Sequence, residues 1–262
     1  WYLNPYLNDT DPSYISQGNS ELDSEKSHAF NLSYSNFTQK FNINLSARYS
    51  FTNNSIENVT KLMPDTEIEG LKNPTGKDVL YSTYANIGKT RRASVSAYVN
   101  WNATPRTRIY MNMSGDYSYM EGSEGMRNDG WSLFAYGGAQ QTLPHDWRIS
   151  LNVFGQTPWI MLQGKGSSFF DYGLSVNKSF LNKRLTLSAF ASNFFKKYMD
   201  QSSTTEGAGF IRESSYKYSR QRFGISVSYR IGELKASVKK AARTISNDDV
   251  KSGGSGSGGG GE

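Results

Sequence analysis

Hydrophobic and polar residues alternate one by one through most of the chain up to residue 230. Residues 41–51, for example, read FNINLSARYSF. Successive side chains of a β-strand point to opposite faces, so this alternation predicts strands with one apolar face and one polar face. We expect a strand in each of nine segments: 28–36, 41–51, 93–101, 108–114, 131–143, 147–153, 170–177, 185–192 and 223–230.

The length of these segments and the spacing between them favour a membrane barrel over a soluble sheet. Most alternate over about 10 residues, the length of a tilted membrane-spanning strand, whereas ordinary strands average about 5–6. Their polar positions carry mainly Ser, Asn and Thr, as a crowded polar lumen would. Outer-membrane barrels alternate short periplasmic turns with long outer loops. Here the short turns are at 36–39, 102–106, 143–146 and 180–184, and the long loops at 53–78, 121–130, 157–167 and 199–216.

Aromatic residues gather near both ends of the predicted strands. Rings at two levels form the interfacial girdles of membrane barrels, because an amphipathic ring sits well at the level of the headgroups. Packing in the core of a soluble β-sandwich is the alternative for any single ring, but two bands together favour the girdle. The expected girdle comprises Phe41, Trp101, Trp147 and Tyr229 beside the short turns, and Tyr119, Trp131, Phe170 and Phe195 towards the long loops.

The odd number of strands indicates part of a larger barrel. Bacterial single-chain barrels close with an even number of strands. The ninth strand ends on the short-turn side, so counting backwards places residues 1–25 in an extracellular loop. The predicted fold of residues 1–231 is therefore all-β, the C-terminal segment of an antiparallel transmembrane β-barrel. A periplasmic basic and Gly/Ser-rich tail follows at 232–262; its composition predicts disorder, with a short amphipathic helix at 233–245 as the alternative for its first part.

Composition excludes several other classes of protein. The 262 residues include no Cys, which excludes disulfides and thiolate sites. No apolar run of about 18 residues exists, so a transmembrane helix is excluded. The net charge of +6 is spread along the chain, whereas nucleic-acid binding needs a clustered basic stripe. The chain opens at Trp1 without a signal peptide or an initiator Met, as expected of a mature product or of a fragment of a longer protein.

No constellation of residues indicates catalysis, a metal site or a cofactor. Gly88-Lys89-Thr90 has the end of a phosphate-binding loop, but Thr83 stands where that loop requires Gly. His28 and His145 are distant in sequence and have no Ser or carboxylate partner at a recognisable spacing. A triad assembled only in space stays open at this stage. An enzyme is the least favoured class, and we expect no cofactor.

Two motifs and the tail resemble one family of outer-membrane proteins. Residues 18–25, GNSELDSE, resemble the G-N-P-x-L-x-P-E box before a late barrel strand in TonB-dependent receptors and their relatives. Residues 86–88, NIG, precede the strand at 92–101 and resemble the N-x-G turn or bulge of the same barrels. Residues 239–251 look like the C-terminal extension of one related subgroup. Departures from these patterns are Ser20 and Ser24 in place of Pro, and Ala93 where Gly is common.

The resemblance implies an outer-membrane barrel that takes up a nutrient or another ligand in a Gram-negative bacterium. It also implies, besides outer-membrane lipid, an N-terminal plug, the TonB energy-coupling system and a surface lipoprotein as partners. The outer loops would capture the ligand, and the polar faces of the strands would line the lumen. The charged lumen-facing residues would then be Arg48, Arg108, Asp116, Arg148, Asp171 and Arg230.

Two other functions fit the same pattern. A non-transporting barrel, acting as a surface scaffold, an adhesin or a secretion component, predicts the same strands without a plug. A soluble β-sandwich binding module predicts instead that the apolar faces are buried and that the protein is soluble without detergent.

Overall fold

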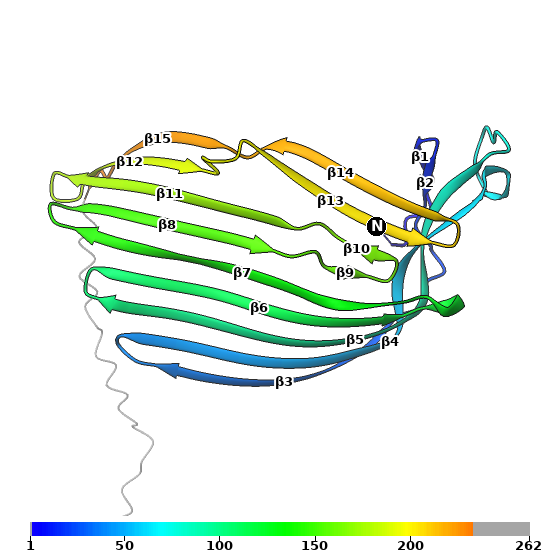
Figure 1. The fold of residues 1–262 in the computed structure, drawn as a ribbon, viewed down its shortest axis with the longest axis horizontal. Helices are drawn as coiled ribbons and strands as arrows, with labels where there is room; N and C mark the ends of the chain where they lie inside the picture. Colours follow the sequence, from blue (N-terminus) through cyan, green and yellow to red (C-terminus); the bar gives the residue numbers. More distant parts are fainter. Residues whose placement is uncertain (1, 233–262) are drawn as a thin grey trace, which may run out of the picture. The chain divides into compact units, whose positions relative to one another are not determined.

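The structure, a computed structural model, describes residues 2–232; the chain divides into two compact units, residues 1–229 and 230–262. The expected tail from residue 233 on, which includes the alternative helix at 233–245, lies outside the described residues. Nine long strands of an 11-stranded sheet form an antiparallel meander in the first unit (Figure 1). They are β3 (Lys26–Phe37), β4 (Phe41–Pro64), β5 (Asp78–Thr104), β6 (Thr107–Glu121), β7 (Arg127–Leu143), β8 (Trp147–Gln156), β11 (Phe169–Phe180), β12 (Leu185–Ser192) and β15 (Arg222–Tyr229).

These nine strands follow one another through the sheet in chain order, as an antiparallel meander. The prediction of nine alternating strands is confirmed. Short connections join β3 to β4, β5 to β6, β7 to β8 and β11 to β12, where the sequence predicts short turns. All four lie at one end of the sheet (Figure 1), which we call the turn end. The opposite end is the loop end.

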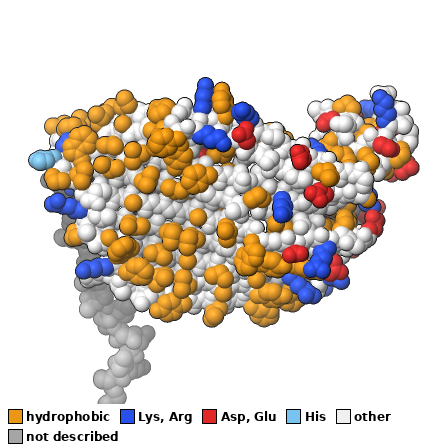
Figure 2. All heavy atoms as spheres, viewed as in Figure 1, with side chains coloured by type: hydrophobic (Ala, Val, Ile, Leu, Met, Phe, Trp, Pro, Cys, Tyr) orange, Lys and Arg blue, Asp and Glu red, His pale blue; other side chains and the backbone are white. Residues whose placement is uncertain are grey.

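The register collects the apolar positions of all nine strands on one face of the sheet. Phe41 is opposite Trp101 in the β4–β5 pair, and Leu151 is opposite Leu174 in the β8–β11 pair. Directly opposed residues share a face, so such pairs extend one apolar face from β3 to β15. This face is exposed, with Phe30 66% accessible. Hydrophobic side chains spread over the visible surface between the two ends, and charged side chains lie mainly towards those ends and along the upper edge of the view (Figure 2).

Two strands run further than the sequence pattern indicates. The prediction of a long loop at 53–78 is wrong in extent, because β4 and β5 stay paired as far as Pro64 and Asp78. A bulge interrupts this pair: Asn54 and Ile87 have no direct partner, and Asn54 has a φ of 57°. An extra residue shifts the two-residue alternation, which hides the continuation of both strands from a sequence pattern. The loop itself is confined to 65–77.

The other expected loops also contain regular structure. A hairpin of β13 (Tyr198–Gly207) and β14 (Phe210–Ser219) occupies most of the expected loop at 199–216. A smaller hairpin of β9 (Ile160–Met161) and β10 (Gly164–Lys165) lies within the loop at 157–167. The four strands form a second sheet in the order β14-β13-β10-β9. The expected loops at 157–167 and 199–216 are therefore partly folded into strands of their own.

The segment at 1–25 carries two short strands, β1 (Asn8–Asp11) and β2 (Tyr14–Ser16). β2 pairs in parallel with the loop-end extension of β5. Ile15 of β2 packs with Ile68 and Val79 in a small buried apolar cluster. The beginning of the described chain is thus anchored to the part of β5 that precedes the bulge.

The meander is an open sheet within the described residues. β3 pairs only with β4, and β15 pairs only with β12. Each of these edge strands therefore has one side without a strand partner in the described part of the chain. The described residues include no helix with the length and hydropathy needed to cross a membrane.

Candidate functional site

Three of the expected lumen residues lie on the polar faces of β4 and β6: Arg48 and Asp116 flank Ser94 of β5, whereas Arg108 lies at the turn end of β6. Ser94 of β5 is opposite both Arg48 and Asp116, and its Oγ donates a hydrogen bond to Asp116 Oδ1 at 2.5 Å. Arg108 Nε donates to Asn100 Oδ1 at 2.7 Å. Among the described residues, none of these three charged side chains takes part in an ion pair. They are therefore available for contacts with another molecule or another part of the protein.

Asp171 belongs to a network that the sequence did not indicate. Asn193 Nδ2 donates to Asp171 Oδ1 at 2.7 Å, and the Arg220 guanidinium forms an ion pair with the same carboxylate. These contacts tie the segments beside β12 and β15 to β11. Arg148 lies on the polar face of β8, as expected from the alternation. Arg230 follows the end of β15 and belongs to the second unit.

The expected girdle residues lie near the two ends of the nine strands. Seven of the eight are exposed; Tyr119 is half-buried, with the Arg127 guanidinium 4.8 Å from the centre of its ring. Phe195 lies in the connection after β12, where it packs against Phe194. The turn-end group is Phe41, Trp101, Trp147 and Tyr229, and the loop-end group is Tyr119, Trp131, Phe170 and Phe195. Contact of these rings with lipid headgroups stays a prediction.

The two motifs of the family resemblance meet at the bulge. The Asn86 side-chain amide donates to the Asp23 carbonyl at 2.9 Å and accepts from the Asp23 N–H at 2.8 Å. The same amide donates to the Asn54 carbonyl at 3.2 Å. Glu25 Oε2 accepts the Ile56 N–H at 3.0 Å. The box at 18–25 is therefore fixed by side-chain contacts to both strands of the bulged pair.

A partly buried carboxylate lies on the loop side of this bulge. Glu57 Oε1 accepts hydrogen bonds from Ser55 Oγ at 2.8 Å and from Thr90 Oγ1 at 3.1 Å. Gly88 is needed here because a Cβ at that position would lie 2.1 Å from Ser55 Oγ. Burial raises the pKa of Glu57 above its usual value, and this effect outweighs the two hydrogen bonds, which favour the charged form.

The β9–β10 hairpin packs on the polar-face side of β6 and β7 at the loop end. A Cβ at Gly130, a polar-face position of β7, would lie 2.9 Å from Ile160 Cδ1. Asn128 Nδ2 donates to the carbonyls of Met161 and Gly164 at 2.7 and 2.8 Å. Apolar contacts among Met120, Ile160 and Leu162 complete the junction. The hairpin therefore covers part of the polar face.

The tip of this hairpin is hydrogen-bonded to β4 through the side chain of Gln163. Gln163 Oε1 accepts the Thr60 N–H at 2.7 Å, and Gln163 Nε2 donates to the Thr60 carbonyl at 2.9 Å. Both residues are buried, at 9% and 2% exposure. Two hydrogen bonds thus join residues that are 103 positions apart in the sequence.

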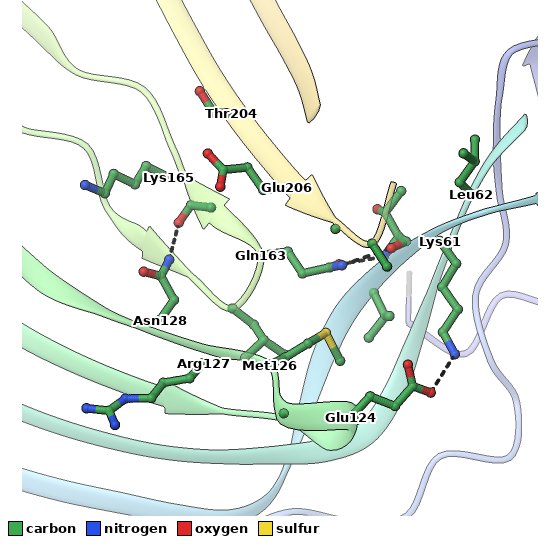
Figure 3. A pocket seen from close by; sticks show the side chains of 17 residues that line it. Lys61, Leu62, Glu124, Met126, Arg127, Asn128, Gln163, Lys165, Thr204 and Glu206 are labelled. Carbon is green, nitrogen blue, oxygen red and sulfur yellow. Dashed lines mark hydrogen bonds and ion pairs between the residues drawn. The ribbon is translucent and has the colours of Figure 1, made fainter. Parts of the chain in front are cut away.

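A cavity of about 810 Å³ lies between β4, the 3-10 turn η2 (Ser123–Gly125), the β9–β10 hairpin and β13 (Figure 3). Lys61 and Glu124 line it and form an ion pair at 3.3 Å. Lys165 and Glu206 also line it, and both are exposed. Neither has an ion-pair partner among the described residues. The cavity therefore presents unpaired charges of both signs.

Sequence reasoning did not find Gln163, Asn193 or Arg220. All three lie in connections, outside the alternating segments, and their partners are remote in sequence. A two-residue period carries no information on such contacts. Among residues 2–232, no group of three or more His, Asp or Glu side chains is placed to hold a metal ion.

Comparison with known proteins gives one family match. Residues 1–229 match the model of a family described as the outer membrane protein beta-barrel family. The match covers all nine strands of the meander. No curated protein and no solved structure gives a significant match to the chain.

Proposed function

The chain belongs to the outer membrane protein beta-barrel family, and we propose that it acts as a receptor-like barrel for ligand uptake. Membership of the family places the protein in the outer membrane, with its strands crossing the bilayer. In such a barrel the exposed apolar face meets lipid and the polar face lines the lumen. The proposal adds that a ligand enters from the loop end and passes along the polar face.

The cavity at the loop end carries this proposal. It lies on the polar-face side, and unpaired Lys165 and Glu206 are among its lining residues. Ligand sites are concave and contain a few polar groups that orient the ligand. A barrel serving only as a surface scaffold has no need of such a cavity beside its lumen face.

The contact between the two motifs supports the receptor-like type. The box at 18–25 and Asn86 occur together in the sequences that this chain resembles, and here they form one hydrogen-bonded junction. We extend the proposal to the partners that the resemblance implies. These are an N-terminal plug, against which Arg108 and Arg148 would lie, the TonB energy-coupling system and a surface lipoprotein.

The test uses photo-crosslinking in the complete protein in its native membrane. A photo-reactive amino acid replaces Arg148 on the polar face, and a matched variant carries it at the neighbouring apolar-face residue Trp147. We expect the Arg148 variant to crosslink to a protein segment inside the barrel, identified by mass spectrometry. The Trp147 variant should crosslink to lipid. Absence of protein crosslinks from position 148, together with steady ion conductance of the purified protein in planar bilayers, would contradict uptake and favour the non-transporting barrel.

A further inference from the structure

One edge of β4 lacks a partner strand near the cavity. Pairing between β3 and β4 ends at Lys26 and Asn53, while β4 continues to Pro64. In an antiparallel pair, alternate residues direct their N–H and C=O groups to opposite sides of the strand. Ile56 and Thr60 both bond to side chains on the side away from β5. Residues of β4 that lie an even number of positions from Ile56 and Thr60 therefore direct their N–H and C=O groups to the same side, away from β5.

Gln163 shows what this edge binds. Its primary amide has the donor and acceptor of a peptide unit, and it makes two bonds with Thr60, one to the N–H and one to the carbonyl. An added β-strand makes the same pair of bonds with an edge residue. At Ile56 the N–H is taken by the Glu25 carboxylate. Side chains thus cover this edge at two points, as proteins commonly protect exposed strand edges.

Leu62 is the next residue along the same edge, and it lines the cavity. It is in phase with Thr60, so its N–H and carbonyl point away from β5. β3 pairs with β4 on this side only as far as Asn53, and beyond Asn53 no strand of the described chain pairs with β4 there. Leu62 is 41% exposed. One unpaired backbone donor and one acceptor are therefore available at the wall of the cavity.

Charges lie on the opposite wall of the cavity. Lys165 of β10 is opposite Thr204 of β13, and Glu206 is two residues further along β13. The three residues therefore share one face of the small sheet, and all of them line the cavity (Figure 3). An ammonium group and a carboxylate without ion-pair partners match the two charged ends of a zwitterion.

We propose that the cavity binds a short extended peptide of about two or three residues, which adds to the edge of β4 at Leu62 beside the Gln163 amide. Backbone hydrogen bonds to Leu62 hold the peptide, and Lys165 and Glu206 attract its terminal carboxylate and ammonium groups. Main-chain pairing of this kind provides affinity for many sequences, while pockets and charges provide selectivity. The inference rests on the proposed function, since it names the class of ligand that the barrel would take up.

The first experiment measures peptide retention by the complete protein in detergent. The probe is a pool of random tripeptides with free termini, and the control is a matched pool with methylated backbone nitrogens. Methylation removes the N–H donors that strand pairing needs. We expect retention of the first pool to exceed that of the second at least about tenfold, which corresponds to about 1.4 kcal/mol. Equal retention of both pools, or none, would overturn the proposal.

A second readout locates the peptide. Hydrogen exchange at the Leu62 amide should slow when the free-termini pool is added, whereas exchange at the Lys61 amide, which faces β5, should not change. Lys165→Met and Glu206→Gln should each weaken retention several-fold. Lys217→Met on β14 and Glu69→Gln in the loop at 65–77 change the same charges at exposed residues outside the cavity and should have no effect. Peptide binding without a change at Leu62 would refute addition at this edge.

The two proposals fail separately. Crosslinks from position 148 to a plug segment, without peptide retention, would overturn the peptide ligand and leave the receptor-like barrel. Peptide retention without such crosslinks would support the peptide site and contradict the proposed route of uptake.

Discussion

Individual polar side chains secure the backbone where strands of this sheet lose a partner. Asn86 bonds both backbone groups of Asp23, and Gln163 bonds both backbone groups of Thr60. Thr60 is buried, and leaving a buried backbone group without a partner costs about 1–3 kcal/mol. Asp23 is exposed, so its two bonds serve chiefly to position the box. These two amides therefore determine where the box and the β9–β10 hairpin can lie. Neither contact follows from the spacing of residues in the sequence.

At the same scale, the raised pKa of Glu57 predicts a pH dependence of stability. A carboxyl group with a higher pKa in the folded protein binds more protons when folded, so stability falls as pH rises above the ordinary value near 4.5. Glu57→Gln keeps the acceptor for Ser55 and Thr90 and removes the charge.

We expect the Glu57→Gln variant to lose this part of the pH dependence and to be more stable than the unmodified protein at pH 7. Guanidinium unfolding of the complete protein at several pH values measures both effects. Glu213→Gln, at an exposed residue, is the control; an unchanged pH profile in the Glu57 variant would contradict the prediction.

At the scale of elements, alternation identified all nine strands of the meander but not their full extent. β4 and β5 pass through a bulge at Asn54 and Ile87, where the two-residue period shifts. The sequence pattern therefore predicts a loop from residue 53, where β4 in fact continues to Pro64. The hairpins β9–β10 and β13–β14 were missed for a related reason. β9 and β10 are two residues each, too short to show a period, and β13 is mostly polar.

The two faces of each strand predict opposite responses to a charged substitution. Leu151, on the apolar face of β8, is opposite Leu174 and Ala139. Leu151→Arg should destabilise the protein by about 2–4 kcal/mol, because the charge would lie in the lipid near the middle of the membrane. Ser150→Arg places the same side chain on the polar face, where the cost should be much smaller. Unfolding free energies in lipid vesicles compare the two variants. Equal costs would show that the apolar face does not meet lipid.

At the scale of the whole molecule, the open meander raises the question of what pairs with β3 and β15. Unpaired backbone groups are not tolerated in the hydrocarbon region. In the membrane, both edges must therefore meet further strands or each other. The odd strand number favours further strands, so the prediction that the nine strands are part of a larger barrel stands to be tested.

Photo-crosslinking at the two edges tests this prediction. A photo-reactive amino acid replaces Ser33 in the middle of β3 or Ser226 in the middle of β15, in the complete protein in its membrane. We expect crosslinks from each position to a strand outside the nine described. The same substitution at Ser46 of β4, an interior strand, should crosslink to no strand of the sheet other than β3 and β5. Crosslinks joining Ser33 directly to β15 would show instead that the nine strands close on themselves.

The sequence by itself determined the strand count, the two faces and the outer-membrane class. The strand count and the two faces follow from the alternation of neighbouring residues, which is local to each segment. The outer-membrane class follows from the length and spacing of the segments, the aromatic residues at their ends and the motifs of the family resemblance. Only the tertiary structure decided how the loop end is built: the continuation of β4 and β5, the network at Asp171, the hairpin on the polar face and the Gln163–Thr60 contact. The cavity follows from the same contacts. They join residues up to 103 positions apart, and such contacts depend on which segments meet in space, which no periodicity along the chain encodes.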